Sequence, residues 1–139
     1  MSTDFPITIF HNPACGTSRN TLAMIEAAGY APTVIPYLET GWTADQLQRL
    51  LSQAGLKAND VLRVKNTPAE ELGLTKPGVS EAALIKAMTE HPILVERPIV
   101  STPKGVRLCR PSEKVLELLD NQPAAFTKED GEVVIPKRR

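Results

Sequence analysis

The most constraining feature of this sequence is a cysteine at the junction between a short strand and a helix. The alternating apolar run Ile7–Phe10 is typical of a β-strand. Asn12 and Pro13 favour a turn directly after it. An apolar face with helical spacing begins after Thr17. Cys15 is therefore expected at, or just before, the N-terminus of a helix.

This position suits both a nucleophile and an anion. Unpaired backbone N–H groups and the positive end of the helix dipole gather there, so a thiol loses its proton readily and an anion binds readily. Gly16, Thr17 and Ser18 would supply those N–H groups. A lone cysteine is more often a small buried hydrophobe, but the polar neighbours of Cys15, His11 among them, favour a reactive thiol.

A second apolar run, residues 33–38, predicts another strand after the helix. A strand, a helix and a strand in about thirty residues form a βαβ unit, so the two strands should be parallel. Pro36 cannot donate a hydrogen bond to a neighbouring strand, which places this strand at a sheet edge.

Residues 43–91 are predicted to form a helical block without a convincing strand. Thr43–Gln46 and Thr67–Glu70 each match a capping box, and the short helix after the second is expected to stop near Gly73. Ser80 is expected to cap a further helix.

Two apolar runs, residues 99–101 and 106–109, flank Pro103-Lys104-Gly105 and predict a β-hairpin. An amphipathic helix should follow it, and from about residue 120 the polar chain indicates a loosely held tail. The element order predicts an α/β protein with a mixed four-stranded sheet. This is a thioredoxin-like fold with a helical insertion between the βαβ and ββα halves.

Composition narrows the class of protein. The 139 residues suit a single domain, 1–139, and 16 basic residues balance 16 acidic ones. No charge excess indicates a nucleic-acid partner, and no apolar run is long enough to span a membrane. The first residues lack a signal-peptide pattern, and neither cysteine lies in a CxxC motif. We therefore expect a cytoplasmic protein with reduced thiols.

Several segments form a recognisable set of motifs in one order along the chain. They are His11–Thr21, Tyr37–Thr40, His91–Leu94, Arg97–Val100, Leu108–Glu113 and Phe126–Gly131. Together they closely resemble the glutaredoxin-dependent arsenate reductases of the ArsC family, almost end to end. Such a set is far more specific than a lone CxxxR motif.

The resemblance implies that the protein reduces arsenate to arsenite. In that reaction the thiolate of Cys15 attacks arsenate and forms a covalent arsenic–sulfur adduct. Glutathione then attacks, glutaredoxin removes the glutathione as a disulfide, and arsenite leaves. The resemblance thus implies glutathione as a co-substrate and glutaredoxin as a partner, with no tightly bound cofactor and no metal.

The resemblance also assigns roles to individual residues. It gives thiol activation to His11, oxyanion binding to Arg97 and Arg110, and support of the intermediate to Arg63. The expected catalytic residues are Cys15, His11, Arg63, Arg97 and Arg110. The residues expected to bind arsenate are Gly16, Thr17, Ser18, Arg63, Arg97 and Arg110.

The chemistry of arginine supports this assignment independently. A guanidinium group offers a planar fork of donors to an oxyanion and keeps its charge. Arg97 and Arg110 flank the predicted hairpin, which should lie beside the first strand. The resemblance places a cis peptide bond before Pro98. Cys109 alternates with Leu108, so we interpret it as a packing residue and not as a resolving thiol.

Three other functions compete. Regulators of the Spx type, which bind RNA polymerase, share this fold but usually carry a CxxC switch, and here Ser18 stands three positions after Cys15. A cysteine phosphatase needs a CxxxxxR loop, whereas Arg19 follows Cys15 by four. A glutathione-dependent thiol reductase would need Cys15 but not the three arginines, and it remains the main alternative.

Overall fold

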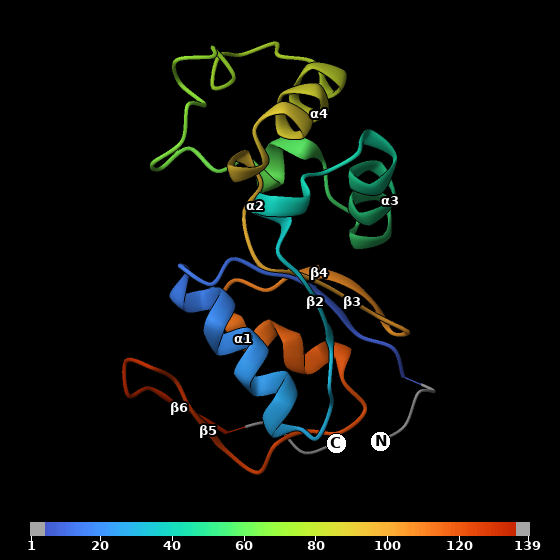
Figure 1. Ribbon diagram of the computed structural model, residues 1–139, viewed down its shortest axis with the longest axis vertical. Coiled ribbons are helices and arrows are strands. Elements are labelled where there is room, and N and C mark those ends of the chain that lie inside the picture. Colours follow the sequence, from blue (N-terminus) through green and yellow to red (C-terminus); the bar gives the residue numbers. More distant parts are fainter. Residues whose placement is uncertain (1–4, 136–139) are drawn as a thin grey trace. The chain divides into compact units, whose positions relative to one another are not determined.

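The computed structural model describes residues 5–135, which belong to two compact units (Figure 1). The first unit joins the chain up to Pro36 with the chain from Arg97 onward, and the second is Tyr37–Glu96. The first contains β1 (Thr8–Phe10), α1 (Gly16–Ala27), β2 (Thr33–Ile35), β3 (Ile99–Thr102), β4 (Gly105–Leu108), the 3-10 helix η3 (Ser112–Leu118), β5 (Phe126–Thr127) and β6 (Val133–Val134). The second contains α2 (Tyr37–Thr40), α3 (Ala44–Ala54), η1 (Ala58–Val61), α4 (Glu81–Glu90) and η2 (Pro92–Leu94).

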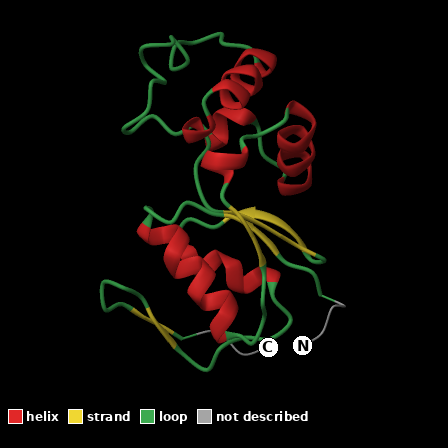
Figure 2. Ribbon diagram, viewed as in Figure 1, coloured by secondary structure: helices red, strands yellow, loops and turns green. Residues whose placement is uncertain are grey.

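The first unit is built on a mixed sheet, drawn in yellow in Figure 2. It has four strands in the order β2-β1-β3-β4. β1 is parallel to β2 and antiparallel to β3, and β3 and β4 form the predicted hairpin. The α/β fold class predicted from the sequence is confirmed, including the edge position of β2. Phe10, Ile99 and Leu108 lie in one row across β1, β3 and β4. The segments that adjoin these residues therefore leave the sheet at the same end.

The core of this unit lies where α1 and η3 cover the same side of the sheet (Figure 2). Ile9 on β1, Val100 on β3 and Met24 and Ile25 on α1 are all fully buried. Burial of each such side chain contributes roughly 1.5–3 kcal/mol to folding. The buried residues of α1 recur every three or four positions and mark its core-facing side: Ser18, Thr21, Met24 and Ile25.

The second strand is shorter than residues 33–38, because the chain turns into α2 after Pro36. Tyr37 is almost completely buried, its ring lies 5.2 Å from that of Trp42, and its hydroxyl donates to the carbonyl oxygen of Val95 at 3.5 Å. Burial of this aromatic side chain outweighs the β-propensity of the local sequence.

The second unit confirms two of the three predicted helix starts. The Thr43 hydroxyl accepts a hydrogen bond from the backbone N–H of Gln46, and α3 ends at Gly55 in a left-handed conformation with φ of 71°. Ser80 likewise accepts from the backbone N–H of Ala83 at the start of α4. The buried side chains of these two helices are Leu47, Leu50, Leu51, Leu84, Ile85, Ala87 and Met88.

The helix predicted after Thr67 is wrong, since residues 67–73 form turns. The Thr67 hydroxyl accepts from the backbone N–H of Ala69, two residues on, and not from the third residue as in a capping box. Forming the first turn of a helix is unfavourable, and only further helical residues offset that cost. Here Gly73, with φ of 73°, ends the segment too early for that.

The loosely held tail expected after residue 120 is also wrong through residue 135. β5 and β6 form an antiparallel hairpin, with Phe126 opposite Val134. Its connecting turn carries Glu129, which pairs with Arg19 on α1. Residues 137–139, the basic end of the predicted tail, lie outside the described residues. The strands of the hairpin have only two residues each, too few to show an alternating pattern, and its contact with α1 joins residues 110 apart in the sequence.

No helix within residues 5–135 is long and apolar enough to cross a membrane. That the full chain acts as a single domain stays a prediction.

Candidate active site

The loop between β1 and α1 presents Cys15 as the N-cap residue of α1. The backbone N–H of His11 donates to the Ile35 carbonyl at 2.8 Å, and this hydrogen bond fixes the loop to the end of β2. The Asn12 side chain accepts from the backbone N–H of Ala14 at 2.9 Å, and the N–H of Cys15 donates to the Asn12 carbonyl at 3.0 Å. These turn contacts hold the sulfur-bearing residue in one place.

The Cys15 thiol is mostly buried, with 8% of the residue exposed, yet its environment favours the thiolate. Burial is the largest single influence and raises the pKa of this thiol. The guanidinium groups of Arg97 and Arg110, together with the backbone of Ser18, outweigh burial. The pKa of Cys15 therefore lies below its ordinary value. A low-pKa thiol at a helix N-terminus is a suitable nucleophile.

Two arginines from the two ends of the β3–β4 hairpin reach this thiol. Arg110 Nη1 lies 3.8 Å from the Cys15 sulfur and donates to the Arg97 carbonyl at 2.9 Å. The N–H of Cys109 donates to the Pro98 carbonyl at 2.9 Å and holds the two corners together.

Both arginines immediately precede a proline in a cis peptide bond, Arg97–Pro98 and Arg110–Pro111. The first of these bonds is the one that the family resemblance implied, and the second was not predicted.

Arg97 carries two donors that are unsatisfied within the described part of the chain. Its Nε and Nη1 atoms are buried and have no hydrogen-bond partner among residues 5–135. A buried, unsatisfied charged donor is costly, so such groups normally have a partner. An oxyanion at the thiol would supply acceptors for a planar fork of this kind. The arrangement can thus hold an anion against a nucleophilic sulfur.

His11 is linked to the thiol through Ser18 and not by a direct hydrogen bond in this structure. Its Nδ1 lies 2.7 Å from the Ser18 hydroxyl, which also accepts from the backbone N–H of Asn12 at 3.1 Å. Burial, followed by the charge of Arg19, lowers the pKa of His11 below its ordinary value. The lowered pKa favours the neutral ring, and His11 is bonded through Ser18 to the first turn of α1. Sequence reasoning listed both residues but did not foresee their contact.

Arg63 belongs to the second unit. Its Nη1 pairs with Glu96 Oε1 at 2.8 Å, and its backbone N–H donates to the Leu94 carbonyl at 2.7 Å. This fixes the Arg63 side chain, of which 14% is exposed. Its expected part in the reaction stays a prediction.

Cys109 is a free cysteine within the apolar core of the first unit. It is fully buried, and burial raises its pKa to about 12. Such a thiol is almost never ionised at neutral pH. Its position agrees with a packing residue.

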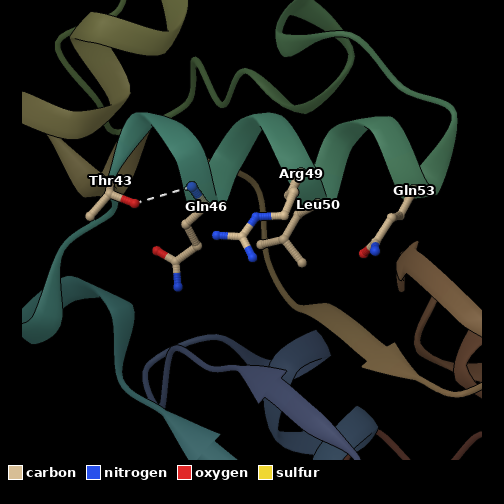
Figure 3. Close-up of a pocket in the computed structure, with 5 residues that line it drawn as sticks. All are labelled: Thr43, Gln46, Arg49, Leu50 and Gln53. Carbon is tan, nitrogen blue, oxygen red and sulfur yellow. Dashed lines mark hydrogen bonds between the residues drawn. The ribbon is translucent and has the colours of Figure 1, made fainter.

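The second unit has a shallow hollow along one side of α3 (Figure 3). The hollow has a volume of about 440 Å³. It is lined by residues of one side of α3 and of its N-cap: Thr43, Gln46, Arg49, Leu50 and Gln53. None of the predicted site residues lines it.

Comparison with known proteins agrees with this geometry. The model of the ArsC family matches residues 10–118. Arsenate reductase ArsI1 of Synechocystis sp. is 56% identical over 137 residues, which cover 98% of this chain and 95% of the relative. Arsenate reductase of Escherichia coli strain K12 is 56% identical over 130 residues, covering 93% and 92%.

A solved structure extends the likeness to three dimensions. An arsenate reductase from Vibrio cholerae superposes with a TM-score of 0.79 at 46% sequence identity, covering 83% of this chain and 98% of that one. The family model's match begins at the last residue of β1 and includes the Cys15 loop, α1, the β3–β4 hairpin and all of η3. This chain belongs to the ArsC family.

Proposed function

We propose that this protein reduces arsenate to arsenite, with the Cys15 thiol as the nucleophile. The observation that carries the proposal is the position of this thiol between two guanidinium groups, of which Arg97 holds two buried, unpaired donors. Relatives named arsenate reductase, at more than half identity, support the same reaction. A tetrahedral, multiply charged anion suits this pattern of donors.

In the first step the Cys15 thiolate attacks the arsenic atom. A sulfur–arsenic bond forms, and one arsenic–oxygen bond breaks as that oxygen is protonated and leaves as water. Arg97 and Arg110 neutralise the anion, which lowers the cost of bringing it to a thiolate. The backbone N–H groups at the start of α1, from Gly16 to Ser18, add further donors.

The reduction needs two electrons, which we assign to external thiols. Glutathione attacks the arsenic of the adduct as a co-substrate and displaces a second oxygen as water. A glutaredoxin thiolate then attacks the glutathione sulfur, and the bond between that sulfur and arsenic breaks. The glutathione leaves in a mixed disulfide with glutaredoxin, and the two electrons of the broken bond stay on arsenic and reduce it. Water releases arsenite and returns the Cys15 thiol. Cys109 is unsuited to replace these thiols, because it is buried and its pKa is raised to about 12.

We assign supporting roles to His11 and Arg63. His11 acts through the Ser18 hydroxyl, since that contact fixes the turn whose backbone lowers the pKa of Cys15. Arg63 supports the intermediate, and its pairing with Glu96 limits the positions that its side chain can take. No tightly bound cofactor is needed in this scheme.

The test is arsenite formation by the purified protein with glutathione, glutaredoxin and arsenate. Steady turnover that needs all three components supports the proposal. Absence of arsenite at any arsenate concentration would overturn it.

A general glutathione-dependent thiol reductase is the second candidate, favoured by the low-pKa thiol on a thioredoxin-like fold. Such an enzyme would reduce small mixed disulfides and would tolerate loss of Arg97. Turnover of a glutathione mixed disulfide in the absence of any arsenate turnover would favour it.

A further inference from the structure

The turn of the β5–β6 hairpin contacts both segments that carry the reacting groups. Lys128 and Glu129 are neighbours in the sequence, yet they pair with different elements. Glu129 pairs with Arg19 on α1, four residues after Cys15. Lys128 pairs with Glu113 on η3, three residues after Arg110.

The contact to α1 is bidentate and reaches the active-site loop. Arg19 Nε and Nη2 donate to the two carboxylate oxygens of Glu129, each at 2.8 Å. Its third nitrogen, Nη1, donates to the Pro13 carbonyl at 2.8 Å, and its backbone N–H donates to the Cys15 carbonyl at 2.9 Å. The backbone N–H of Glu129 also donates to the side-chain oxygen Oδ1 of Asn20 at 3.0 Å, which adds a third hydrogen bond between the hairpin and α1. Arg19 thus joins the hairpin to the backbone of Pro13 and of Cys15 itself.

The contact to η3 is closer and less exposed. Lys128 Nζ lies 2.7 Å from Glu113 Oε1, and only 10% of the Lys128 side chain is exposed. The hydrogen bond from Lys128 is the largest influence on Glu113 and lowers the pKa of its carboxyl group. The N–H of Lys114, next to Glu113, donates to the Pro111 carbonyl directly after Arg110.

We propose that the β5–β6 hairpin is a positioning element for the reaction. Glu129 holds the Cys15 loop through Arg19, and Lys128 holds the Arg110 corner through Glu113. Because the two residues are adjacent, they fix the alignment of the thiol relative to the guanidinium group. This inference rests on the proposed arsenate reduction.

The physical argument concerns alignment and not net charge. A single exposed ion pair contributes little to stability, but a bidentate arginine–carboxylate pair also restricts geometry. Misplacement of reacting groups by about 1 Å can lower a rate by up to about a hundredfold. Loss of Glu129 leaves Arg19 without its counter-charge, which by electrostatics alone would favour the Cys15 thiolate. A fall in arsenate turnover without a fall in thiol reactivity would therefore indicate misalignment.

The test compares Glu129→Gln and Lys128→Met with two control variants. Glu117→Gln removes an exposed ion pair of similar kind, to Arg107 at 3.1 Å, elsewhere in the first unit. Glu132→Gln removes the Lys128 contact that stays within the hairpin. Arsenate kcat and KM, the pH profile of Cys15 alkylation by a neutral reagent, and Tm are measured for each protein.

We expect Glu129→Gln and Lys128→Met each to lower arsenate kcat/KM by about three- to tenfold, with the alkylation rate unchanged or faster. Arg19→Gln is also measured alone and together with Glu129→Gln. The double variant should lose no more than the larger of these two single losses, because the pair acts as one contact. Both controls should stay within about twofold of wild type, the range expected of an exposed pair.

Two results overturn the inference while leaving the proposed function intact. One is a loss of less than about threefold in arsenate kcat/KM in both hairpin variants, which is smaller than the loss that misaligned reacting groups should cause. The other is an equal loss in the control variants. A wild-type protein that makes no arsenite overturns the proposed function and this inference with it.

Discussion

Arg110 Nη1 lies 3.8 Å from the sulfur of Cys15, although 95 residues separate them in the sequence. The strand register accounts for this proximity. Phe10, Ile99 and Leu108 share one row of the sheet, so the Cys15 loop and both arginine corners start from the same end. The closeness of the Cys15 thiol to the arginine corners is therefore a direct consequence of how β1, β3 and β4 pair.

Removal of either arginine should harm arsenate chemistry more than thiol chemistry. Arg97→Ala or Arg110→Ala removes a charge-assisted contact of roughly 1.5–3 kcal/mol, which corresponds to about ten- to hundredfold in arsenate kcat/KM. Lysine should restore only part, because it lacks the planar fork. Both rates are measured on the same variants, with alkylation followed at a pH where the thiol is fully ionised. Equal losses in the two rates would assign these arginines to the thiol alone.

The rate of Cys15 alkylation should depend on pH in a defined direction. The pKa of this thiol is lowered, so the thiolate forms, and the rate rises, at a lower pH than for an ordinary cysteine. Arg97→Ala should move the midpoint upward, because Arg97 is the strongest of the influences that lower the pKa. Rates with iodoacetamide between about pH 5 and 10 span the ordinary thiol pKa and check this. A midpoint unchanged by Arg97→Ala would contradict the described contact.

Cys109→Ser should keep most of the arsenate turnover per folded molecule. Its cost should appear in stability, because a hydroxyl replaces a fully buried sulfur in an apolar core. We expect a loss of about 1–3 kcal/mol in the free energy of unfolding, measured by urea denaturation. A variant that folds fully but makes no arsenite would show that Cys109 takes part in the redox cycle.

Electron supply should come from outside the chain. Omission of glutathione or of glutaredoxin should stop multiple turnover, because the second thiol, Cys109, is buried and un-ionised. The measurement is arsenite formed per enzyme molecule with each component left out. Sustained turnover with thioredoxin alone would require an internal disulfide and would contradict this scheme.

Local sequence signals predicted the part of the fold that carries the thiol. The β1–loop–α1 unit, the β3–β4 hairpin and the caps at Thr43 and Ser80 follow from periodicity and side-chain chemistry within a few residues. The turn at Asn12 and Pro13 was also predicted from these two residues alone. The approach of Arg97 and Arg110 was expected from their places at the ends of the hairpin.

Most of the features that were missed depend on contacts outside the local sequence. Tyr37 enters a helix because Trp42 and Val95 bury it, and not because of its neighbours. Thr67 matches a capping box but bonds two residues on. Lys128 and Glu129 lie in the segment that was expected to be a loosely held tail, yet they pair with Glu113 on η3 and Arg19 on α1. No spacing in the sequence indicates such pairs.

The most direct test of the whole account is arsenite formation by Cys15→Ser beside the wild-type protein. Both are assayed with glutathione, glutaredoxin and arsenate, after their folding has been matched by circular dichroism. A hydroxyl is a far weaker nucleophile than a thiolate at neutral pH. The account predicts steady arsenite formation by the wild type and none above background by Cys15→Ser. Turnover by the serine variant at a rate near that of the wild type would contradict it.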